Sequence, residues 1–362
     1  DRGEAVKVFM NAMKRNPTER LLLMIDRVTR TKQLLPNREL LSLVQGNVSK
    51  LHPISASIEA KAMKNLGRDR DALIAMEKSW NKFEESISNG WLPQSSIEDW
   101  FLDLRELFDD DPNAGEEMIY KLAGSTLLDY QLAGLAAYWK AFGNEYIDKA
   151  ILIIEKAVVN TELGSTTRVQ LLTLLGTYLV DAGRFEDSEK IFRQLSEEYD
   201  SPVVLNNLAY VIGVYLNKPQ DGLVLARQAV KKMPRNVSYI DTIATLHNRS
   251  GDYKKAAETL EYLLQIDPAK TSAMSQLAVL YSEHLGQPDR GVVFAERARS
   301  QTPRSPEVLD ALGWSYYQTG RTSTGEEYLL NSLNRGETMD AYIHLAQVVM
   351  SRSEHDKALG HL

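Results

Sequence analysis

The residue types that most often carry chemistry are sparse in this chain, and they form no catalytic pattern. The 362 residues include no cysteine, which excludes disulfides, thiolate catalysis and cysteine-ligated zinc. The histidines form no His-Glu-x-x-His pattern, and the separation of His355 and His361 is not the i, i+4 pairing of metal ligands on a helix. Neither a glycine-rich phosphate loop nor a Gly-x-Ser-x-Gly turn is present. The sequence therefore predicts no catalytic residue, no metal site and no cofactor.

One acidic turn resembles the start of a calcium-binding loop. Asp109, Asp111 and Asn113 alternate as the first ligands of such a loop do. However, Ala114 stands where the turn needs glycine, and Tyr120 stands where a bidentate glutamate is required. The acidic residues are therefore expected to favour the N-terminus of the helix that follows, where the helix dipole attracts negative charge.

The elements that would position any site are short helices recurring at a nearly fixed interval. Residues 306–334 show apolar residues at helical spacing on both sides of a break at Gly320. Gly313 and Gly325 lie one in each helix, where two helix backbones could approach closely. The same first helix is traced along the chain by a bulky aliphatic residue followed by Gly or Ala. These tracking pairs are Leu135-Ala136, Leu175-Gly176, Leu208-Ala209, Ile243-Ala244, Leu277-Ala278, Leu312-Gly313 and Leu345-Ala346.

Successive tracking pairs recur at a period of about 34 residues, and the first step, from Leu135 to Leu175, is longer. The clearest copy runs from Val237 to Pro268, with a Gly251 turn and a closing proline that ends its second helix. This period and arrangement resemble the tetratricopeptide repeat family. The resemblance implies an all-α fold, a right-handed superhelical solenoid of antiparallel helix pairs. It also implies a concave groove lined by the first helices, which in this family usually binds a peptide segment of a partner protein.

The regularity of the repeat divides the chain into two regions. Residues 129–362 are expected to form a regular array of about seven repeats, the last of them incomplete and ending within its second helix. Residues 1–128 are interpreted as degenerate repeats of the same type. The first residues, Ala5 to Pro17, match the second helix of a repeat whose first helix is missing. Because solenoid ends need a polar capping surface, we expect the chain to be a fragment of a longer protein.

Two of the repeats are related by a constant offset that spans two periods. Residues from Leu208 to Arg235 recur as Leu277 to Arg304, with identical residues at many positions. Both copies are one residue longer than their neighbours, and the sequence places the extra residue in the turns at 218–221 and 287–290. The two longer turns are expected on the same edge of the array, either through duplication of a two-repeat unit or by chance convergence on a common turn.

The predicted groove residues lie on the face of each first helix that is turned away from the second helix. Tyr210, Trp314 and Tyr317 would be its aromatic anchors for a bound segment. An alternative is that Asn206 and Asn207 serve contacts with neighbouring helices and that Trp314 is half-buried packing. Tyr178, Tyr281, Tyr316 and Trp139 are expected to be packing residues. The full predicted set is Asn206, Tyr210, Asp241, Thr245, Asn248, Ser275, Asp310, Trp314 and Tyr317.

The groove lacks the Lys and Arg cluster with which chaperone-binding members of the family grip a C-terminal carboxylate, so tail capture is not expected. Residues 1–65 are basic, with 12 Lys and Arg against 6 Asp and Glu, but they lack the aromatic series that stacks single-stranded nucleic acid. A nucleic-acid-binding solenoid is therefore the weakest option, and no nucleic acid partner is expected. No apolar run is long enough to span a membrane.

The expected function is a non-catalytic scaffold for protein–protein interaction that binds a partner segment in the groove. The run from Leu205 to Tyr210 resembles bacterial repeat proteins, so a bacterial envelope or export assembly is the expected setting. The alternative is a helical regulatory or substrate-recruiting arm of a larger enzyme whose catalytic domain lies elsewhere. The compartment stays open between the cytoplasm and the bacterial periplasm or envelope.

Overall fold

The computed structural model describes Arg38, Leu41 and residues 53–90, 97–124, 126–162, 165–336 and 338–359. Throughout these residues the regular structure is helical and no strand occurs, which confirms the predicted all-α class. The half repeat predicted at Ala5 to Pro17 and most of the basic segment lie outside the described residues. None of the described helices is both long and apolar enough to cross a membrane.

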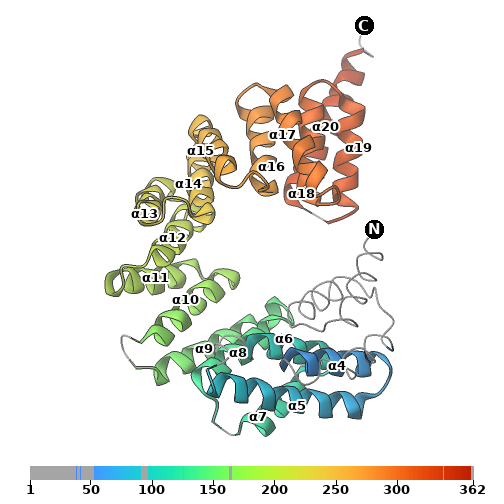
Figure 1. Cartoon of the computed structure of the whole chain (residues 1–362). Coiled ribbons are helices and arrows are strands. Elements are labelled where there is room, and N and C mark those ends of the chain that lie inside the picture. The colour runs from blue at the N-terminus through green and yellow to red at the C-terminus, as the bar shows by residue number, and fades with distance from the viewer. Residues whose placement is uncertain are drawn as a thin grey trace. The chain divides into compact units, whose positions relative to one another are not determined.

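The chain divides into two compact units between Arg184 and Phe185 (Figure 1). This division does not test the predicted change in repeat regularity after residue 128, which stays a prediction. The described helices of the first unit are α4 (Pro53–Asn65), α5 (Asp69–Ser88), α6 (Ile97–Leu107), α7 (Pro112–Ala123), α8 (Asp129–Lys140), the 3-10 turn η3 (Asn144–Tyr146), α9 (Ile147–Asn160) and α10 (Thr166–Asp181).

The second unit is a run of helix pairs. Within it, α12 packs on α13, α14 on α15, α16 on α17 and α18 on α19, which are the pairs that the tracking residues predict. Its elements are α11 (Phe185–Glu198), α12 (Pro202–Tyr210), η4 (Val211–Tyr215), α13 (Pro219–Lys232), α14 (Val237–Arg249), α15 (Tyr253–Ile266), α16 (Thr271–Val279), η5 (Leu280–His284), α17 (Pro288–Gln301), α18 (Pro306–Gln318), α19 (Thr322–Leu333) and α20 (Met339–Leu359).

Glycine permits the close crossing of the paired helices α18 and α19. A Cβ atom built on Gly313 would lie 2.8 Å from the carbonyl oxygen of Gly325, and one on Gly325 would lie 2.7 Å from the carbonyl oxygen of Gly313. Gly222 and Gly291 make similarly close approaches to the carbonyls of α12 and α16. The expectation that small residues sit where helix backbones meet is therefore confirmed.

The two copies that share the longer repeat differ from their neighbours in the helix and not in the turn. Each first helix ends in a π-helical segment, η4 or η5. Three residues then connect this segment to the second helix, the same number as between α14 and α15. The N–H of Leu216 donates to the carbonyl of Val211, and Leu285 does the same to Leu280. Because a π turn holds one more residue than an α turn, the helix absorbs the extra residue. The prediction of two longer turns is wrong for this reason.

The last repeat also departs from expectation. A turn and the start of a second helix were predicted before Leu362, but α20 continues as one helix from Met339 to Leu359. It packs against α18 and α19 of the preceding repeat. The end of the array therefore presents a single first helix within the described residues.

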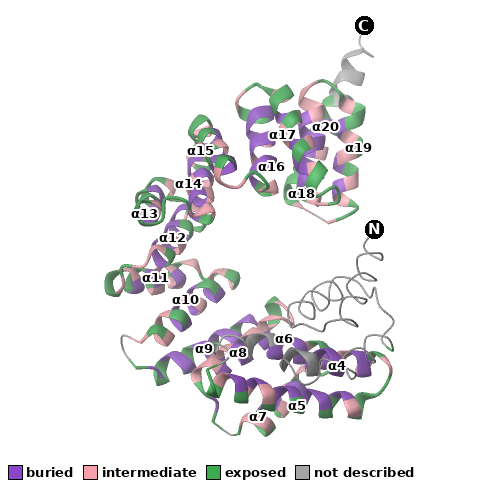
Figure 2. Cartoon of the chain, viewed as in Figure 1, coloured by how far each residue is buried: buried purple, intermediate pink, exposed green. Residues whose placement is uncertain are grey.

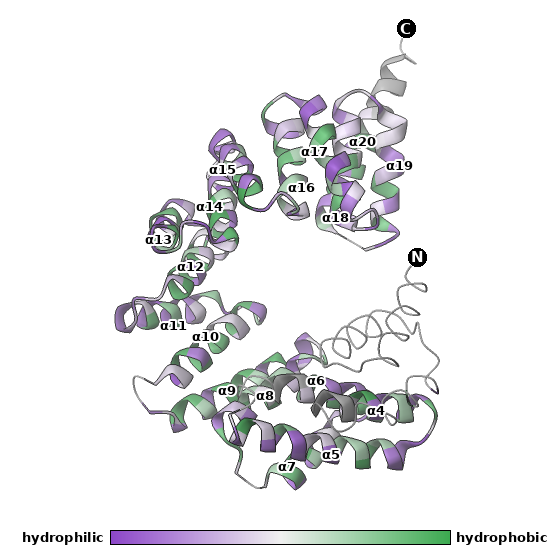
Figure 3. Ribbon diagram, viewed as in Figure 1, coloured by the Kyte–Doolittle hydropathy of each residue, from purple (hydrophilic) through white to green (hydrophobic). Residues whose placement is uncertain are grey.

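The core of each unit lies between the facing sides of its helices, where Figure 2 shows the buried residues and Figure 3 the hydrophobic ones. In the first unit Trp80, Trp100 and Phe101 pack edge to face at its centre. Tyr178 and Tyr281 are each 4% exposed, which confirms the interpretation of these aromatic residues as packing residues. Hydrophobic burial of this kind is the main force that holds such an array together.

Candidate partner-binding face

Eight of the nine predicted groove residues fall into an accessible set and a buried set, and the ninth, Tyr317, is half-buried on α18. The accessible set lies on α12 and α14, and we call it the first-helix face. Tyr210 and Asn248 are exposed there, and the others are half-buried. The face consists of Asn206, Tyr210, Asp241, Thr245 and Asn248.

An aromatic cluster borders the first-helix face at Tyr210. The Tyr215 ring, at the end of η4, meets the Tyr210 ring at 5.7 Å and an edge-on angle of 66°. It also stacks on Phe185 of α11, with ring centroids 4.7 Å apart. Tyr210 is 36% exposed and Tyr215 is 40% exposed, so the cluster offers aromatic surface to a partner. The sequence reasoning missed Tyr215 and Phe185, because the π turn that directs Tyr215 toward α11 was interpreted as a longer loop.

Asp241 provides a carboxyl group at the centre of the first-helix face. Its Oδ1 accepts a hydrogen bond from Nε2 of Gln276 at 3.4 Å, which links α14 to α16. Burial raises the pKa of Asp241, while Lys270 and the Gln276 hydrogen bond oppose the shift. Burial likewise raises the pKa of Tyr210, so its hydroxyl stays protonated at neutral pH and can donate a hydrogen bond to a partner. The face thus combines an aromatic ring with polar groups that suit a peptide backbone.

The buried set lies on α16 and α18. Ser275 is 7% exposed, Asp310 is 5% and Trp314 is 3%. The Trp314 ring stacks against Tyr317 at 5.3 Å, and the Tyr317 hydroxyl donates to Oγ of Ser351 on α20 at 2.8 Å. Within this structure Trp314 therefore packs between helices, as the alternative interpretation held. The physical reason is that α20 covers this part of α18.

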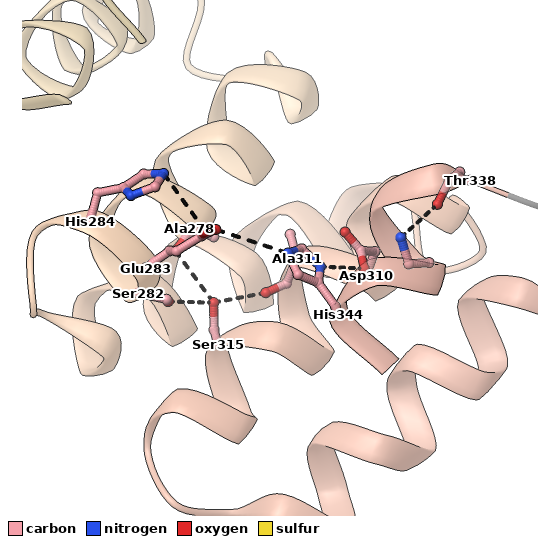
Figure 4. Close-up of polar contacts among 10 residues, drawn as sticks. Ala278, Ser282, Glu283, His284, Asp310, Ala311, Ser315, Thr338 and His344 are labelled. Atoms are coloured by element: carbon pink, nitrogen blue, oxygen red, sulfur yellow. Dashed lines mark hydrogen bonds and ion pairs between the residues drawn. The ribbon is translucent and has the colours of Figure 1, made fainter. Parts of the chain in front are cut away.

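A network of buried polar side chains joins the first helices of the last repeats, η5, α18 and α20 (Figure 4). His344 of α20 pairs through Nδ1 with Oδ1 of Asp310 at 2.8 Å, and its ring stacks on Trp314 at 4.3 Å. The other ring nitrogen faces the carboxylate of Glu283 at 4.0 Å, and not a serine hydroxyl. This arrangement cross-links η5, α18 and α20. No pattern within one helix pairs His344 with Asp310, because the two residues belong to successive repeats.

The acidic turn before α7 starts a helix, as expected. Oδ1 of Asp111 accepts the N–H of Ala114 at 3.2 Å and so caps α7. Within the described residues, no three His, Asp or Glu side chains come together in a way that could hold a metal ion.

Comparison with known proteins agrees with the helix pairs described above. Residues 248–314, which include α15, α16, α17 and most of α18, match the model of the tetratricopeptide repeat. The chain contains tetratricopeptide repeats. A solved tetratricopeptide repeat protein from Parabacteroides merdae shares the fold with a TM-score of 0.55, at 14% identity, over 70% of this chain and 99% of that one.

Two bacterial relatives are similar in sequence to parts of this chain. A TPR repeat-containing protein of Pseudomonas aeruginosa is 22% identical over 174 residues, which are 47% of this chain and 29% of the relative. Lipopolysaccharide assembly protein B of Escherichia coli is 23% identical over 220 residues, which are 59% of this chain and 56% of the relative. The matches therefore span less than two thirds of either relative's length.

Proposed function

We propose that this chain is a non-catalytic scaffold that binds a segment of a partner protein along the first-helix face. The observation that carries the proposal is the accessible aromatic cluster of Tyr210, Tyr215 and Phe185 beside the polar residues of α12 and α14. Aromatic side chains with both apolar and polar parts are the commonest energetic anchors of protein interfaces. The polar side chains of Asn206, Thr245 and Asn248 suit hydrogen bonding to an extended backbone.

The buried residues Ser275, Asp310 and Trp314 are not part of this proposed surface. Asp310 and Trp314 pack α18 against α20 through His344, and we expect these contacts to make the array more rigid. Rigid presentation lowers the entropy cost of binding, because fewer side chains and helices must be ordered when the partner arrives.

We propose a bacterial envelope or export assembly as the setting. The support is the similarity to a protein named for lipopolysaccharide assembly. Because the relatives share only part of their length with this chain, the similarity supports a setting and no particular partner.

Site-specific photo-cross-linking in the source cell tests the proposal. A photoreactive amino acid replaces Asn248 on the first-helix face in one version and Val224 in the control version. Both positions are exposed, but Val224 lies on α13, a second helix. We expect the Asn248 position to cross-link a defined envelope or export protein that the Val224 position does not. Equal cross-linking of the same protein from both positions would contradict the proposed face.

A further inference from the structure

The π turn η5 moves an acidic side chain onto the side of its helix that is predicted to face a partner. In α14 and α18 the last predicted groove position lies five residues after the first residue of the tracking pair, at Asn248 and Tyr317. The same count reaches Ser282 in η5, but Ser282 is 5% exposed and its hydroxyl donates to Oγ of Ser315 at 2.8 Å. Because the π turn adds one residue, Glu283 takes the equivalent position, and its side chain is exposed.

The π turn η4 shifts the register in the same way. Gly213 lies five residues after the tracking leucine of α12, yet it is buried, and a Cβ atom built on it would lie 2.1 Å from Cδ2 of Leu246. The next residue, Val214, is half-buried. Counting five residues from the tracking pair therefore reaches a buried residue in both repeats that contain a π turn.

The carboxylate of Glu283 lies between two histidines, and no Lys or Arg of the described residues forms an ion pair with it. Its oxygens are 4.0 Å from Nε2 of His284 and 4.0 Å from Nε2 of His344 (Figure 4). Asp310 holds Nδ1 of His344, so in the neutral ring the proton is on Nδ1 and Nε2 presents a lone pair. The neutral imidazole therefore offers Glu283 no positive charge.

The helices around Glu283 carry negative charge and no strong cation. None of α16, η5 and α18 contains a Lys or Arg, whereas η5 and α18 contain Glu283, Glu307 and Asp310. Asp310 is 5% exposed and is paired with His344, but the Glu283 side chain is 35% exposed. Glu283 is thus a carboxylate that solvent can reach and that no Lys or Arg of these helices neutralises. Such a group is complementary to a cationic side chain of a partner.

Stacked rings and an unsatisfied donor lie beside this carboxylate. The ring of His344, which faces Glu283, stacks on Trp314 at 4.3 Å, and Trp314 stacks on Tyr317 at 5.3 Å. Trp314 is 3% exposed, and its Nε1–H has no hydrogen-bond partner among the described residues. The surroundings of Glu283 therefore combine an acceptor without a cation, aromatic rings and a donor without an acceptor. These groups suit a cationic side chain together with the main chain that carries it.

We propose that Glu283 is a specificity residue that binds an arginine or lysine side chain of the partner segment. The inference rests on the proposed function, because it assigns the chemistry of one position in the bound segment. The segment extends beyond the first-helix face to η5. Twelve extended residues span about 40 Å, and neighbouring helices lie about 10 Å apart, so a short segment passes both Tyr210 and Glu283. An arginine at this position also stacks on the neighbouring rings.

The test uses the full chain and a phage-displayed library of random 12-residue peptides. We expect peptides selected on the unaltered chain to share an arginine or lysine, and peptides selected on Glu283→Gln to lose this preference. A selected peptide should bind Glu283→Gln about fivefold more weakly in isothermal titration calorimetry, because a charge-assisted hydrogen bond is lost. Glu258→Gln is the matched control, since it removes the same charge from the exposed side of the second helix α15 and should keep the affinity.

Charge reversal separates a direct contact from an effect on folding. Glu283→Lys should weaken binding of the selected peptide about tenfold or more. It should regain affinity for the same peptide with glutamate in place of its basic residue, and circular dichroism should show unchanged helicity. No preference for basic residues among the selected peptides, or equal affinity of Glu283→Gln and the unaltered chain, would overturn the role of Glu283.

Tyr210→Ala distinguishes this inference from the proposed function. If the selected peptides lose affinity with Tyr210→Ala and keep it with Glu283→Gln, the first-helix face binds a segment and the role of Glu283 is wrong. If both substitutions weaken binding, both proposals are supported. If neither substitution changes the affinity, both proposals are wrong.

Discussion

Asp310 and His344 form a buried polar pair between successive repeats of the second unit. Their side chains meet at 2.8 Å, and Trp314 stacks on the histidine ring. Asp310 is 5% exposed and His344 is 7% exposed, so water cannot replace a lost partner. The pair therefore fixes α20 against α18 in one arrangement.

Replacing Asp310 by alanine should lower the free energy of unfolding by about 1–3 kcal/mol, because the buried Nδ1 of His344 loses its partner. Urea titration followed by circular dichroism measures the change. Glu258→Ala is the control, since Glu258 is exposed on α15 and its ion pair with Lys254 spans 4.0 Å. The control should stay within about 0.5 kcal/mol. Equal stability of the two variants would show that the pair contributes nothing.

His247 gives the second unit a pH dependence of known sign. The side chain is 5% exposed. Burial and the nearby Arg227 lower the pKa of His247 from its ordinary value of 6.5, and Asp252 partly opposes this shift. Below pH 6.5 the unfolded chain therefore binds the proton more readily than the folded chain does. The stability contributed by neutral His247 is present above that pH and is lost as the pH falls below it.

His247→Gln should reduce the loss of stability between pH 7 and pH 5 relative to the unaltered chain. The measurement is the urea midpoint at several pH values for both proteins, and the slope against pH is the readout. A slope that does not change on substitution would contradict the assigned role of His247, even if the variant is less stable at every pH.

Some side-chain environments could be predicted from the sequence and others could not. Tyr178 and Tyr281 lie close to a tracking pair on their own first helix, and helical spacing alone places them in the core. Trp314 also follows a tracking pair, but its burial depends on His344, which belongs to the next repeat. Contacts between repeats are set by how successive helices stack, and a pattern within one helix does not contain that information.

At the scale of elements, the paired helices depend on glycine at their crossing points. The crossing of α18 and α19 brings Gly313 and Gly325 so close that a Cβ on either would meet a carbonyl oxygen at 2.8 Å or less. Backbone atoms cannot move aside as the end of a flexible side chain can. The two helices must separate when a larger residue is introduced.

Gly325→Ala should therefore destabilise the chain by about 1–3 kcal/mol, although alanine is the better helix former. Ser323→Ala on the same helix is the control, since Ser323 is exposed and should change stability little. Thermal and urea unfolding of both variants give the comparison. Stabilisation by Gly325→Ala would mean that intrinsic helix propensity outweighs the close contact.

The helix pairs and their period could be predicted from the sequence, whereas the π turns could not. An extra residue near Pro219 or Pro288 is equally compatible with a longer loop and a wider helical turn. The wider turn keeps the backbone hydrogen-bonded and places Tyr215 against Phe185 and His284 against Tyr253, with ring centroids 4.7 and 3.8 Å apart. Both ring contacts are with the second helix of the preceding repeat, α11 or α15, and are therefore tertiary in origin.

At the scale of the whole molecule, the repeat determines the fold much more strongly than it determines the partner. The same array of helix pairs serves many proteins, and function resides in the side chains on its surfaces. Tyr210, on the first-helix face, was identified from the period alone.

The most direct measurement of the central claim is the affinity of the cross-linked partner for three versions of the chain: unaltered, Tyr210→Ala and Tyr262→Ala. Tyr262 is the matched control, an exposed tyrosine on the second helix α15. Isothermal titration calorimetry should show that Tyr210→Ala weakens binding by about 2 kcal/mol or more, while Tyr262→Ala leaves the affinity unchanged. Unchanged affinity with Tyr210→Ala, or an equal loss with Tyr262→Ala, would contradict the assignment of the first-helix face as the binding surface.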